Sequence, residues 1–320
     1  MFHWAKGFPQ MIDEAANGDS WLAEVNRVAA MIRRRGLELA VEHRGGYVIQ
    51  ACSSADILAT LYVRLMKLGA PPADTLPAPF RGTPRPEAPD QWGGAFNGDD
   101  TPENDRFILS PSHYSTAVYA ALIETGRLSS DALATYNSDG TTLEMIGAEH
   151  SPGIEVTGGS LGQALSVGVG RALWRRRCGH RGLIWVLISD GETQEGQTWE
   201  ALQTAAAFGL DNLRVLIDVN GWQVDGPMDE VMPVGSLTAK AAAFGCAARE
   251  VDGHDPVAIA GAATLDGGGL PIVVVCRTDP TRGFPAIAGR DNSMTHFIRF
   301  RPGEAEEFRA SSPLYEDVPR

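Results

Sequence analysis

Residues 183–221 read LIWVLISDGETQEGQTWEALQTAAAFGLDNLRVLIDVNG, and this stretch decides the fold. It contains two apolar runs, LIWVLIS (183–189) and LRVLIDV (213–219), which lack the polar alternation of a half-exposed strand. Such runs are typical of strands that are buried on both faces. The residues between them have helical spacing up to about Gly209. A strand, a helix and a second strand in this order predict a parallel sheet with right-handed crossovers.

Similar patterns before and after this stretch extend the sheet and its helical layers. Helices are expected at residues 21–42, 55–69, 116–126 and 160–177, and further strands at 106–110, 247–251 and 271–277. The sequence therefore predicts an α/β protein whose parallel sheet has helices on both faces. We expect a single domain that spans residues 1–320.

Two segments of this domain have no periodic pattern. Eight of the twenty prolines lie between residues 70 and 105, so this segment is expected to be a surface loop. From about residue 301 the chain is expected to form a C-terminal tail. Neither segment is expected to divide the domain, because motifs that belong together lie on both sides of the loop.

The composition is that of an ordinary globular protein, with 43% hydrophobic and 21% charged residues. The formal net charge of −13 argues against binding to nucleic acids or anionic membranes, since both would be repelled. The four cysteines have no zinc-site spacing, and the first twenty residues do not have the pattern of a signal peptide. We therefore expect a soluble, cytoplasmic protein with a small-molecule substrate.

Two polar residues follow the two buried strands directly. Asp190 follows the first apolar run and Asn220 follows the second, thirty residues later (220 − 190 = 30). The carboxyl ends of parallel strands meet at one edge of a sheet, so these side chains are expected to lie close together. Their oxygen atoms, beside the backbone N–H of Gly191, are suited to hold Mg²⁺ and a diphosphate.

Here the sequence resembles the thiamine diphosphate motif, a GDG followed by an asparagine at about this distance. The segment DGETQEGQTWEA (190–201) is similar to the corresponding segment in the transketolase branch of that family. The resemblance implies that Asp190, Asn220 and the carbonyl of Trp222 bind Mg²⁺, with Ca²⁺ or Mn²⁺ as alternatives. It also implies that Gly191 and Glu192 contact the cofactor. Ser189 replaces the first glycine of the motif.

Two further segments carry the same resemblance. LSPSHYSTAVYAAL (109–122) resembles a transketolase segment whose histidine contacts the cofactor or the reacting carbon, which implies this role for His113. SPGIEVTGGSLGQALSVGVG (151–170) implies that Gly159, Ser160 and Leu161 lie against the cofactor rings. Each segment taken alone has a purely structural interpretation, as a lone histidine or a glycine-rich helix start.

Two other matches concern catalysis. Glu195 matches an acidic position at the transketolase dimer interface, where a hydrogen-bonded network links two active sites. A carboxylate on a first helical turn is also common for dipole reasons alone. His296, in DNSMTHF, stands where transketolases place a histidine near the diphosphate, so we expect it to contact the cofactor and act in catalysis.

The chain also departs from the transketolase pattern. Tyr47 and Met145 stand where transketolases carry two histidines that bind sugar hydroxyls and move protons. The resemblance covers roughly residues 20–300 and only the diphosphate-binding domain. It implies a second subunit that binds the aminopyrimidine and supplies the glutamate that activates it. We expect self-association and an α2β2 assembly.

Three functions stay open at this point. The first is an enzyme subunit that transfers a two-carbon ketol unit from a ketose to an aldehyde. The second is a subunit of a thiamine diphosphate enzyme that decarboxylates a 2-oxo acid, which the loss of the two histidines favours. The third is a non-catalytic homologue, which has no need of Asp190, Gly191 and Asn220 as an intact set. A nucleoside triphosphate site at 191–198 is disfavoured, because Gln197 stands where the lysine must be.

Overall fold

The sheet has the predicted parallel topology. The computed structural model describes residues 20–82, 91–290 and 295–315, and within them five strands pair in the order β1-β2-β3-β7-β6. All four pairings are parallel. The strands are β1 (Arg106–Leu109), β2 (Ile184–Ser189), β3 (Leu213–Val219), β6 (Ala247–Asp252) and β7 (Ile272–Arg277). The apolar runs 183–189 and 213–219 therefore become the neighbouring strands β2 and β3.

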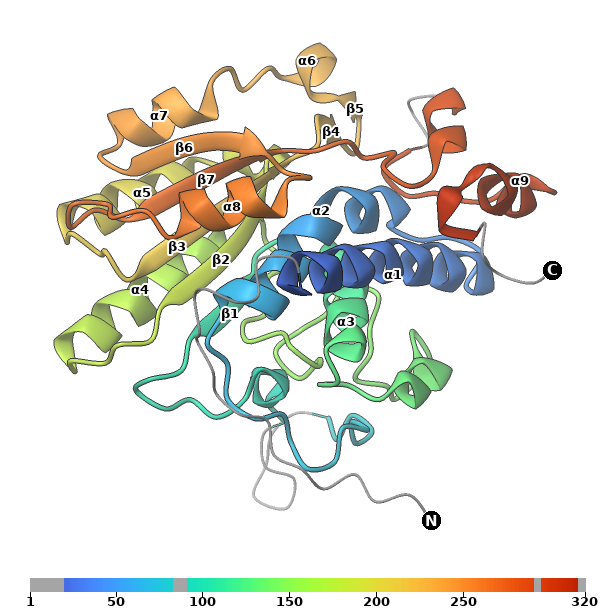
Figure 1. Cartoon of the computed structure of the whole chain (residues 1–320), viewed down its shortest axis with the longest axis horizontal. Coiled ribbons are helices and arrows are strands. Elements are labelled where there is room, and N and C mark those ends of the chain that lie inside the picture. Colours follow the sequence, from blue (N-terminus) through green and yellow to red (C-terminus); the bar gives the residue numbers. More distant parts are fainter. Residues whose placement is uncertain (1–19, 83–90, 291–294, 316–320) are drawn as a thin grey trace.

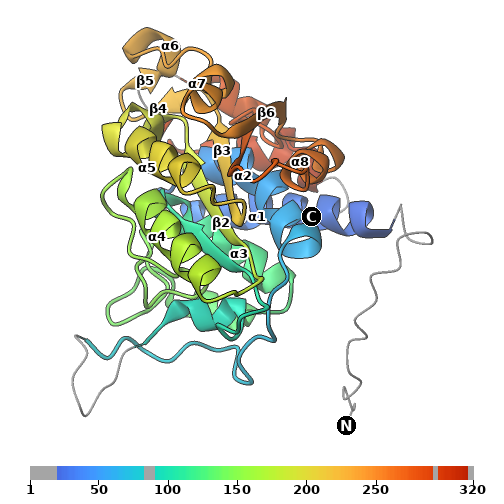
Figure 2. The same ribbon diagram turned by 90° about the vertical axis from the view of Figure 1, so that its left-hand side faces the viewer.

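Helices cover both faces of the sheet, as predicted. Side chains of β2 alternate between the two faces, with Trp185 and Leu187 in one core and Val186 and Ile188 in the other. The first core is closed by α1 (Ser20–Glu42), α2 (Val48–Thr60), α3 (Ser115–Glu124) and α8 (Pro256–Ala263). The second is closed by α4 (Gln163–Arg177), α5 (Gly196–Ala207) and α7 (Leu237–Ala243). Figure 2 shows the sheet between α4 and α5 on one side and α1 and α2 on the other.

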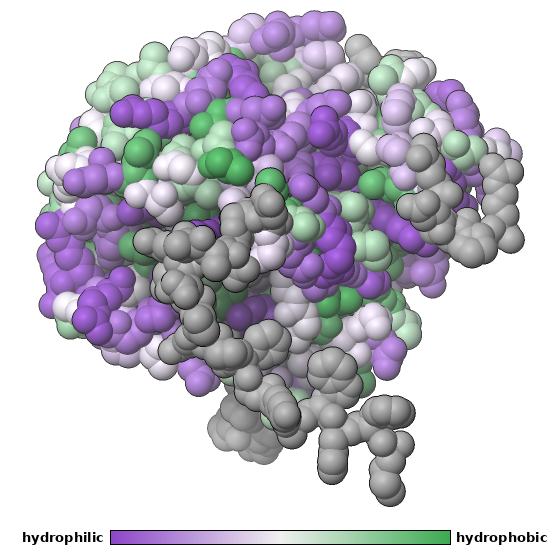
Figure 3. Space-filling model, in the orientation of Figure 1, coloured by the Kyte–Doolittle hydropathy of each residue, from purple (hydrophilic) through white to green (hydrophobic). Residues whose placement is uncertain are grey.

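Helix α2 begins seven residues before the expected helix at 55–69. All thirteen of its residues are buried, so no exposed polar face marks its start in the sequence. The helix continues as a π-helical turn, η1 (Leu61–Leu65). The segment Val48–Leu65 is long and apolar enough to cross a membrane, but 83% of it is buried inside the protein. It is therefore a core helix. Hydrophilic residues cover much of the face of the molecule that Figure 3 shows.

The segment after residue 301 is not a free tail. It forms α9 (Glu304–Ser311) and η8 (Pro313–Tyr315), and Phe308 is buried against the ends of α1 and α2. Phe284 and Ile298 join the same small core, and residue Gly46 pairs with Ile298 in an antiparallel bridge. Figure 1 shows α9 beside one end of α1. This packing places the residues near His296 next to the start of α2.

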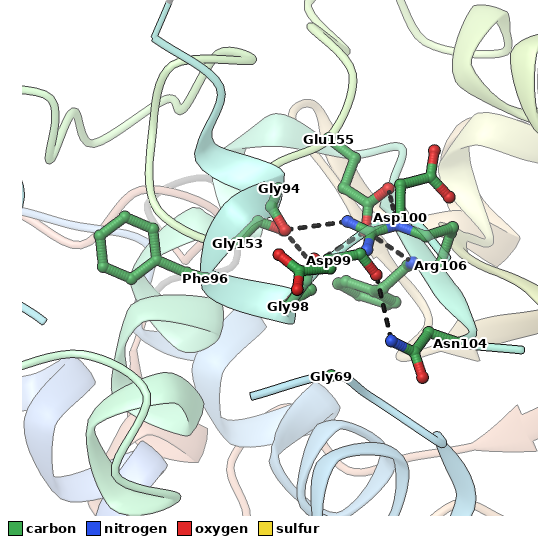
Figure 4. Close-up of polar contacts among 12 residues, drawn as sticks. Gly69, Gly94, Phe96, Gly98, Asp99, Asp100, Asn104, Arg106, Gly153 and Glu155 are labelled. Carbon is green, nitrogen blue, oxygen red and sulfur yellow. Dashed lines mark hydrogen bonds and ion pairs between the residues drawn. The ribbon is translucent and has the colours of Figure 1, made fainter. Parts of the chain in front are cut away.

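Among its described residues, the proline-rich segment is a surface loop apart from residues 93–98 and Asp105. Residues 70–82 contain no buried position, but the short helix η2 (Gly93–Asn97) is largely buried. Its residues surround Arg106, whose guanidinium donates to the carbonyls of Gly94 and Gly98 and to Glu155 (Figure 4). Asn97 also donates to Glu155. The loop therefore folds inward because a buried ion pair needs its carbonyl groups.

Candidate functional site

A cavity of about 390 Å³ lies at the carboxyl ends of β1, β2 and β3. Most of the residues chosen from the sequence line it. These are His113, Gly159, Leu161, Gly191, Glu195, Asn220, Trp222 and His296, together with Tyr47. Parallel strands bring these segments together, because each strand ends at the same edge of the sheet.

Asp190 and Asn220 are joined through the loop that follows β3. Asp190 is 1% exposed, and one of its carboxylate oxygens accepts from the backbone N–H of Gly221 at 2.7 Å. The side-chain oxygen of Asn220 accepts from the N–H of Trp222 at 2.9 Å. Asp190, at the end of β2, is therefore hydrogen-bonded to the backbone of the loop that carries Asn220, although the two residues are thirty positions apart in the sequence.

Beneath this loop lies a carboxylate that the sequence pattern did not single out. Asp218, in β3, is fully buried and accepts hydrogen bonds from Ser53 at 2.5 Å, Tyr114 at 2.8 Å and Thr278 at 2.6 Å. The Tyr114 hydroxyl in turn accepts from the amide of Asn220 at 2.9 Å. This chain of bonds orients Asn220. In the sequence, the only indication of this role was that Asp218 is a carboxylate inside the apolar run LRVLIDV.

The charge of Asp218 affects the protonation of Asp190. Burial, followed by the negative charge of Asp218, raises the pKa of Asp190 to about 7. Burial also raises the pKa of Asp218, against hydrogen bonds that lower it. Both shifts mean that this edge of the sheet holds more negative charge than its own surroundings stabilise.

Three predicted residues, Asp190, Ser160 and Glu192, are not among the residues that line the cavity. Glu192 is fully buried, and its carboxylate accepts from Ser110 and from the backbone N–H of Gly162, the latter at 2.6 Å. It therefore ties the start of α4 to the turn after β2, and burial raises its pKa. Ser160 is exposed on the glycine-rich turn, and only its neighbours Gly159 and Leu161 belong to the cavity wall.

Three rings form one wall of the cavity. The ring centroids of Tyr47 and His113 lie 5.2 Å apart, those of His113 and His296 lie 5.3 Å apart, and those of Tyr47 and His296 lie 5.7 Å apart. Burial, and then the neighbouring His296, lowers the pKa of His113 to about 3. Burial also lowers the pKa of His296. Both imidazoles are therefore neutral near pH 7.

The second departure from the transketolase pattern has a different position. Met145 packs against the core, whereas the next residue, Ile146, lines the cavity and is 51% exposed. Of the two residues that stand in place of transketolase histidines, only Tyr47 lies on the cavity wall.

Comparison with known proteins agrees with this geometry. Residues 96–299 match the family described as "Transketolase, thiamine diphosphate binding domain". This chain belongs to the transketolase family. The match includes the cavity residues that follow β1, β2 and β3, so this transketolase-family site lies within the domain that binds the cofactor.

Relatives of similar length support the same assignment. The chain is 38% identical to an uncharacterised transketolase family protein of Sinorhizobium fredii, over 87% of this chain and 91% of the relative. It is 35% identical to the 6-deoxy-6-sulfo-D-fructose transketolase subunit SqwG of a Clostridium species, over 72% and 75%. It is 32% identical to an apulose-4-phosphate transketolase subunit of Actinobacillus succinogenes, over 83% and 88%.

Solved transketolases share the fold. A transketolase from Pichia stipitis superposes with a TM-score of 0.73 at 22% identity, over 90% of this chain and 40% of the other. The enzyme from Leishmania mexicana gives a TM-score of 0.72 at 23% identity, over 89% and 41%. The transketolase-family chain described here therefore spans about two fifths of those solved chains.

The cavity fits the diphosphate end of this family's cofactor. A Cβ atom added to Gly191 would meet only Gln223, at an ordinary 3.7 Å, and one added to Gly159 would meet nothing within 4 Å. Both glycines belong to the cavity wall and leave their backbone open to it. A side chain there would fill the space that a ligand takes.

Proposed function

We propose that this chain is the diphosphate-binding subunit of a thiamine diphosphate- and Mg²⁺-dependent enzyme. In this proposal the enzyme transfers a two-carbon ketol unit from a ketose donor to an aldehyde acceptor. The observation that carries the proposal is the hydrogen bond that joins Asp190, at the end of β2, to the loop of Asn220 and Trp222 that follows β3. This is a set of oxygen ligands suited to a hard cation that bridges to a diphosphate.

The charge of the cavity supports the metal requirement. Of the described residues that line it, none is lysine or arginine, and Glu195 and Asp225 add negative charge. A diphosphate therefore needs a cation that arrives with it. The candidate ligands are the carboxylate of Asp190, the amide oxygen of Asn220 and the carbonyl of Trp222, which suit Mg²⁺ and also accept Ca²⁺ or Mn²⁺.

The residues of the chain then have distinct tasks. When bound, thiamine diphosphate supplies the nucleophilic carbon that attacks the donor carbonyl. His113, neutral and on the cavity wall, is placed to exchange a proton with a substrate oxygen. His296 lies 5.3 Å from it, between ring centroids, and shares this task. Glu195 is exposed at the cavity and is the candidate contact to another active site.

A second subunit is part of the proposal. Apolar side chains at the cavity are exposed, with Val224 at 67%, Ile146 at 51% and Leu161 at 36%. Exposed apolar groups beside a cofactor site are typical of a surface that another chain covers. Two relatives carry "subunit" in their names. We propose that a chain with the pyrimidine-binding domain covers this surface, in an α2β2 assembly that acts in the cytoplasm.

Activity of the isolated chain tests this arrangement. The chain is mixed with thiamine diphosphate, Mg²⁺ and a panel of ketoses and 2-oxo acids, with and without the partner subunit. We expect turnover only with the partner, because the chain alone leaves the reactive end of the cofactor open to water. Substantial turnover without any added polypeptide would show that the chain is not one half of a divided enzyme.

Tyr47 favours a donor other than xylulose 5-phosphate. A phenol cannot replace a neutral imidazole as a proton carrier near neutral pH. The runner-up function, decarboxylation of a 2-oxo acid, rests on the same residue. Efficient transfer from xylulose 5-phosphate to ribose 5-phosphate by the assembled enzyme would contradict this assignment of donor specificity.

A further inference from the structure

Gln50 is a polar residue on the cavity wall that neither the motif nor the charge pattern points to. It lies in the first turn of α2, is 2% exposed and lines the cavity. Its side-chain oxygen, Oε1, is buried and has no hydrogen-bond partner among the residues that the structure describes. Of the described side chains with such an unpartnered buried atom, Gln50 alone belongs to the cavity wall.

The orientation of the Gln50 amide follows from its neighbour. Its Nε2 donates to the backbone carbonyl of His296 at 3.1 Å and lies 3.3 Å from the ring Nδ1 of the same residue. A backbone carbonyl can only accept, so a reversed amide would place two oxygens against each other at that distance. The NH₂ group must therefore face His296, and Oε1 is the group left without a partner.

The surroundings hold this oxygen in place. Every residue of α2 is buried, and the helix is tied to the sheet by Ser53, which donates to Asp218 at 2.5 Å. The Ser54 hydroxyl donates to the backbone carbonyl of Gln50 at 2.6 Å. The side chain cannot turn outward to reach water without breaking its bond to His296. A buried acceptor held in this way needs a donor that the described residues do not supply.

We propose that Oε1 of Gln50 accepts a hydrogen bond from a hydroxyl group of the donor substrate and thereby selects hydroxylated donors over 2-oxo acids that carry no hydroxyl. The inference rests on the proposed function and names the chemistry of the donor. A site built to bond a hydroxyl discriminates strongly against an analogue that lacks it, because the buried acceptor is then left unpaired. Gln50 is in this sense a specificity-determining residue.

Replacement by methionine tests the role of the oxygen. Gln50→Met keeps the length and volume of the side chain and removes the acceptor. In the assembled enzyme with thiamine diphosphate and Mg²⁺, kcat/KM is measured for xylulose 5-phosphate, fructose 6-phosphate, hydroxypyruvate and pyruvate. We expect kcat/KM to fall about ten- to a hundredfold for the hydroxylated donors, chiefly through KM, and to stay unchanged for pyruvate. Gln203→Met, on the exposed face of α5, makes the same chemical change and is expected to alter neither.

Calorimetric titration with thiamine diphosphate separates the two possible sources of the hydrogen bond. We expect the affinity for the cofactor to be unchanged in Gln50→Met. A lower affinity with an unchanged preference among donors would identify the amino group of the cofactor as the partner and would overturn the inference. If the methionine variant does not assemble, Gln50→Asn replaces it, because its side chain is one methylene shorter and withdraws the acceptor. We expect the same loss of kcat/KM for the hydroxylated donors and the same unchanged affinity for the cofactor.

The remaining outcomes distinguish this inference from the proposed function. A wild-type complex that transfers from hydroxylated donors, with the same preference over pyruvate in both Gln50 variants, contradicts the role of Gln50 alone. A wild-type complex that uses only pyruvate, or none of the four donors, contradicts the proposed function and this inference with it.

Discussion

Two groups of buried charges in this molecule differ in how they are compensated. Around Arg106, 1% exposed, the carboxylate of Glu155 pairs with Arg106 at 2.8 Å and with Arg171 at 2.8 Å (Figure 4). Around Asp190 and Asp218, 1% and 0% exposed, the hydrogen bonds come from hydroxyl, amide and backbone groups. Among the described residues, no lysine or arginine pairs with either of these two carboxylates.

We interpret this difference as the distinction between a group that stabilises the fold and one that, in our proposal, binds a ligand. Buried charges are costly unless they are paired. In the Arg106 group the protein supplies the opposite charge itself, so nothing more is needed. At the edge of β2 and β3 the described residues supply no opposite charge, and the pKa of Asp190 rises to about 7. In our proposal, a metal ion beside Asp190 supplies this missing positive charge.

The largest expected effect is on cofactor binding at the uncompensated edge. Asp190→Ala removes the anionic ligand of the proposed cation, so we expect the affinity for thiamine diphosphate to fall by a factor of about a hundred or more. The midpoint of thermal unfolding is expected to change little, since the side-chain bonds lost are only the two from the backbone N–H groups of Gly191 and Gly221. Calorimetry on the assembled enzyme measures the first and thermal unfolding the second. Unchanged affinity would remove Asp190 from the site.

The opposite pattern is expected in the compensated group. Glu155→Gln leaves Arg106 buried without its charge partner, and breaking a buried pair in this way costs about 3–5 kcal/mol. Urea unfolding measures this loss of stability. At a temperature where the variant is folded, we expect its affinity for thiamine diphosphate to match that of the wild type. A variant that keeps its stability but loses the cofactor would reverse the comparison between the two groups.

These two groups also differ in how far the sequence could predict them. Strand β3 was predicted with its observed bounds, and the residue after it was recognised, because a buried apolar run ends in a lone amide. Asp190 and Asn220 could be placed together from strand order alone. The pairing of Arg106 with Glu155 could not, because the two are 49 residues apart and neither lies in a pattern that marks a contact.

Other misses have equally local causes. The start of α2 carries no amphipathic signal because both of its sides are buried, so Gln50 was missed along with the start of the helix. Helix α9 was missed because its first turn is acidic and only three of its residues, Glu304, Ala305 and Phe308, are buried. Asp218 was recognised only as part of a strand. In each case tertiary packing decides the role of the residue, and the neighbouring sequence shows no hydrophobic periodicity that would indicate it.

A moderate effect is expected at the hidden carboxylate. Asp218→Asn removes a charge but keeps the size of the side chain, and the amide cannot accept on both sides as the carboxylate does. The donors Ser53, Tyr114 and Thr278 then compete for fewer acceptors, which costs about 1–3 kcal/mol. Urea unfolding measures the loss. A variant as stable as the wild type would show that the charge of Asp218 contributes nothing to the fold.

The last expected effect is a change in acid sensitivity. The pKa of His113 is about 3 in the folded chain and about 6.5 when unfolded, so below pH 6.5 the unfolded state binds more protons. Its contribution to stability is fully present above pH 6.5 and is lost as the pH falls toward 3. The groups facing it are Tyr47, Tyr114 and His296.

Replacing this histidine therefore reduces the acid sensitivity. Between pH 6.5 and pH 4.5 the free energy of unfolding of His113→Gln is expected to fall by less than that of the wild type, by up to about 1.4 kcal/mol per pH unit. Urea unfolding at several pH values measures it, and His180→Gln, beyond the end of α4, is the control. Parallel curves for His113→Gln and the wild type would show that His113 is not held neutral by burial.

Removing the metal tests the central claim most directly. Thiamine diphosphate is titrated into the chain with its partner subunit, once in Mg²⁺ and once after chelation of all divalent ions. Because the cavity wall offers no lysine or arginine among the described residues, we expect saturable binding with Mg²⁺ and an affinity at least about a hundredfold weaker without it. Equal affinity in the two titrations would contradict the account, since the edge formed by Asp190 and Asn220 would then hold the diphosphate without a cation.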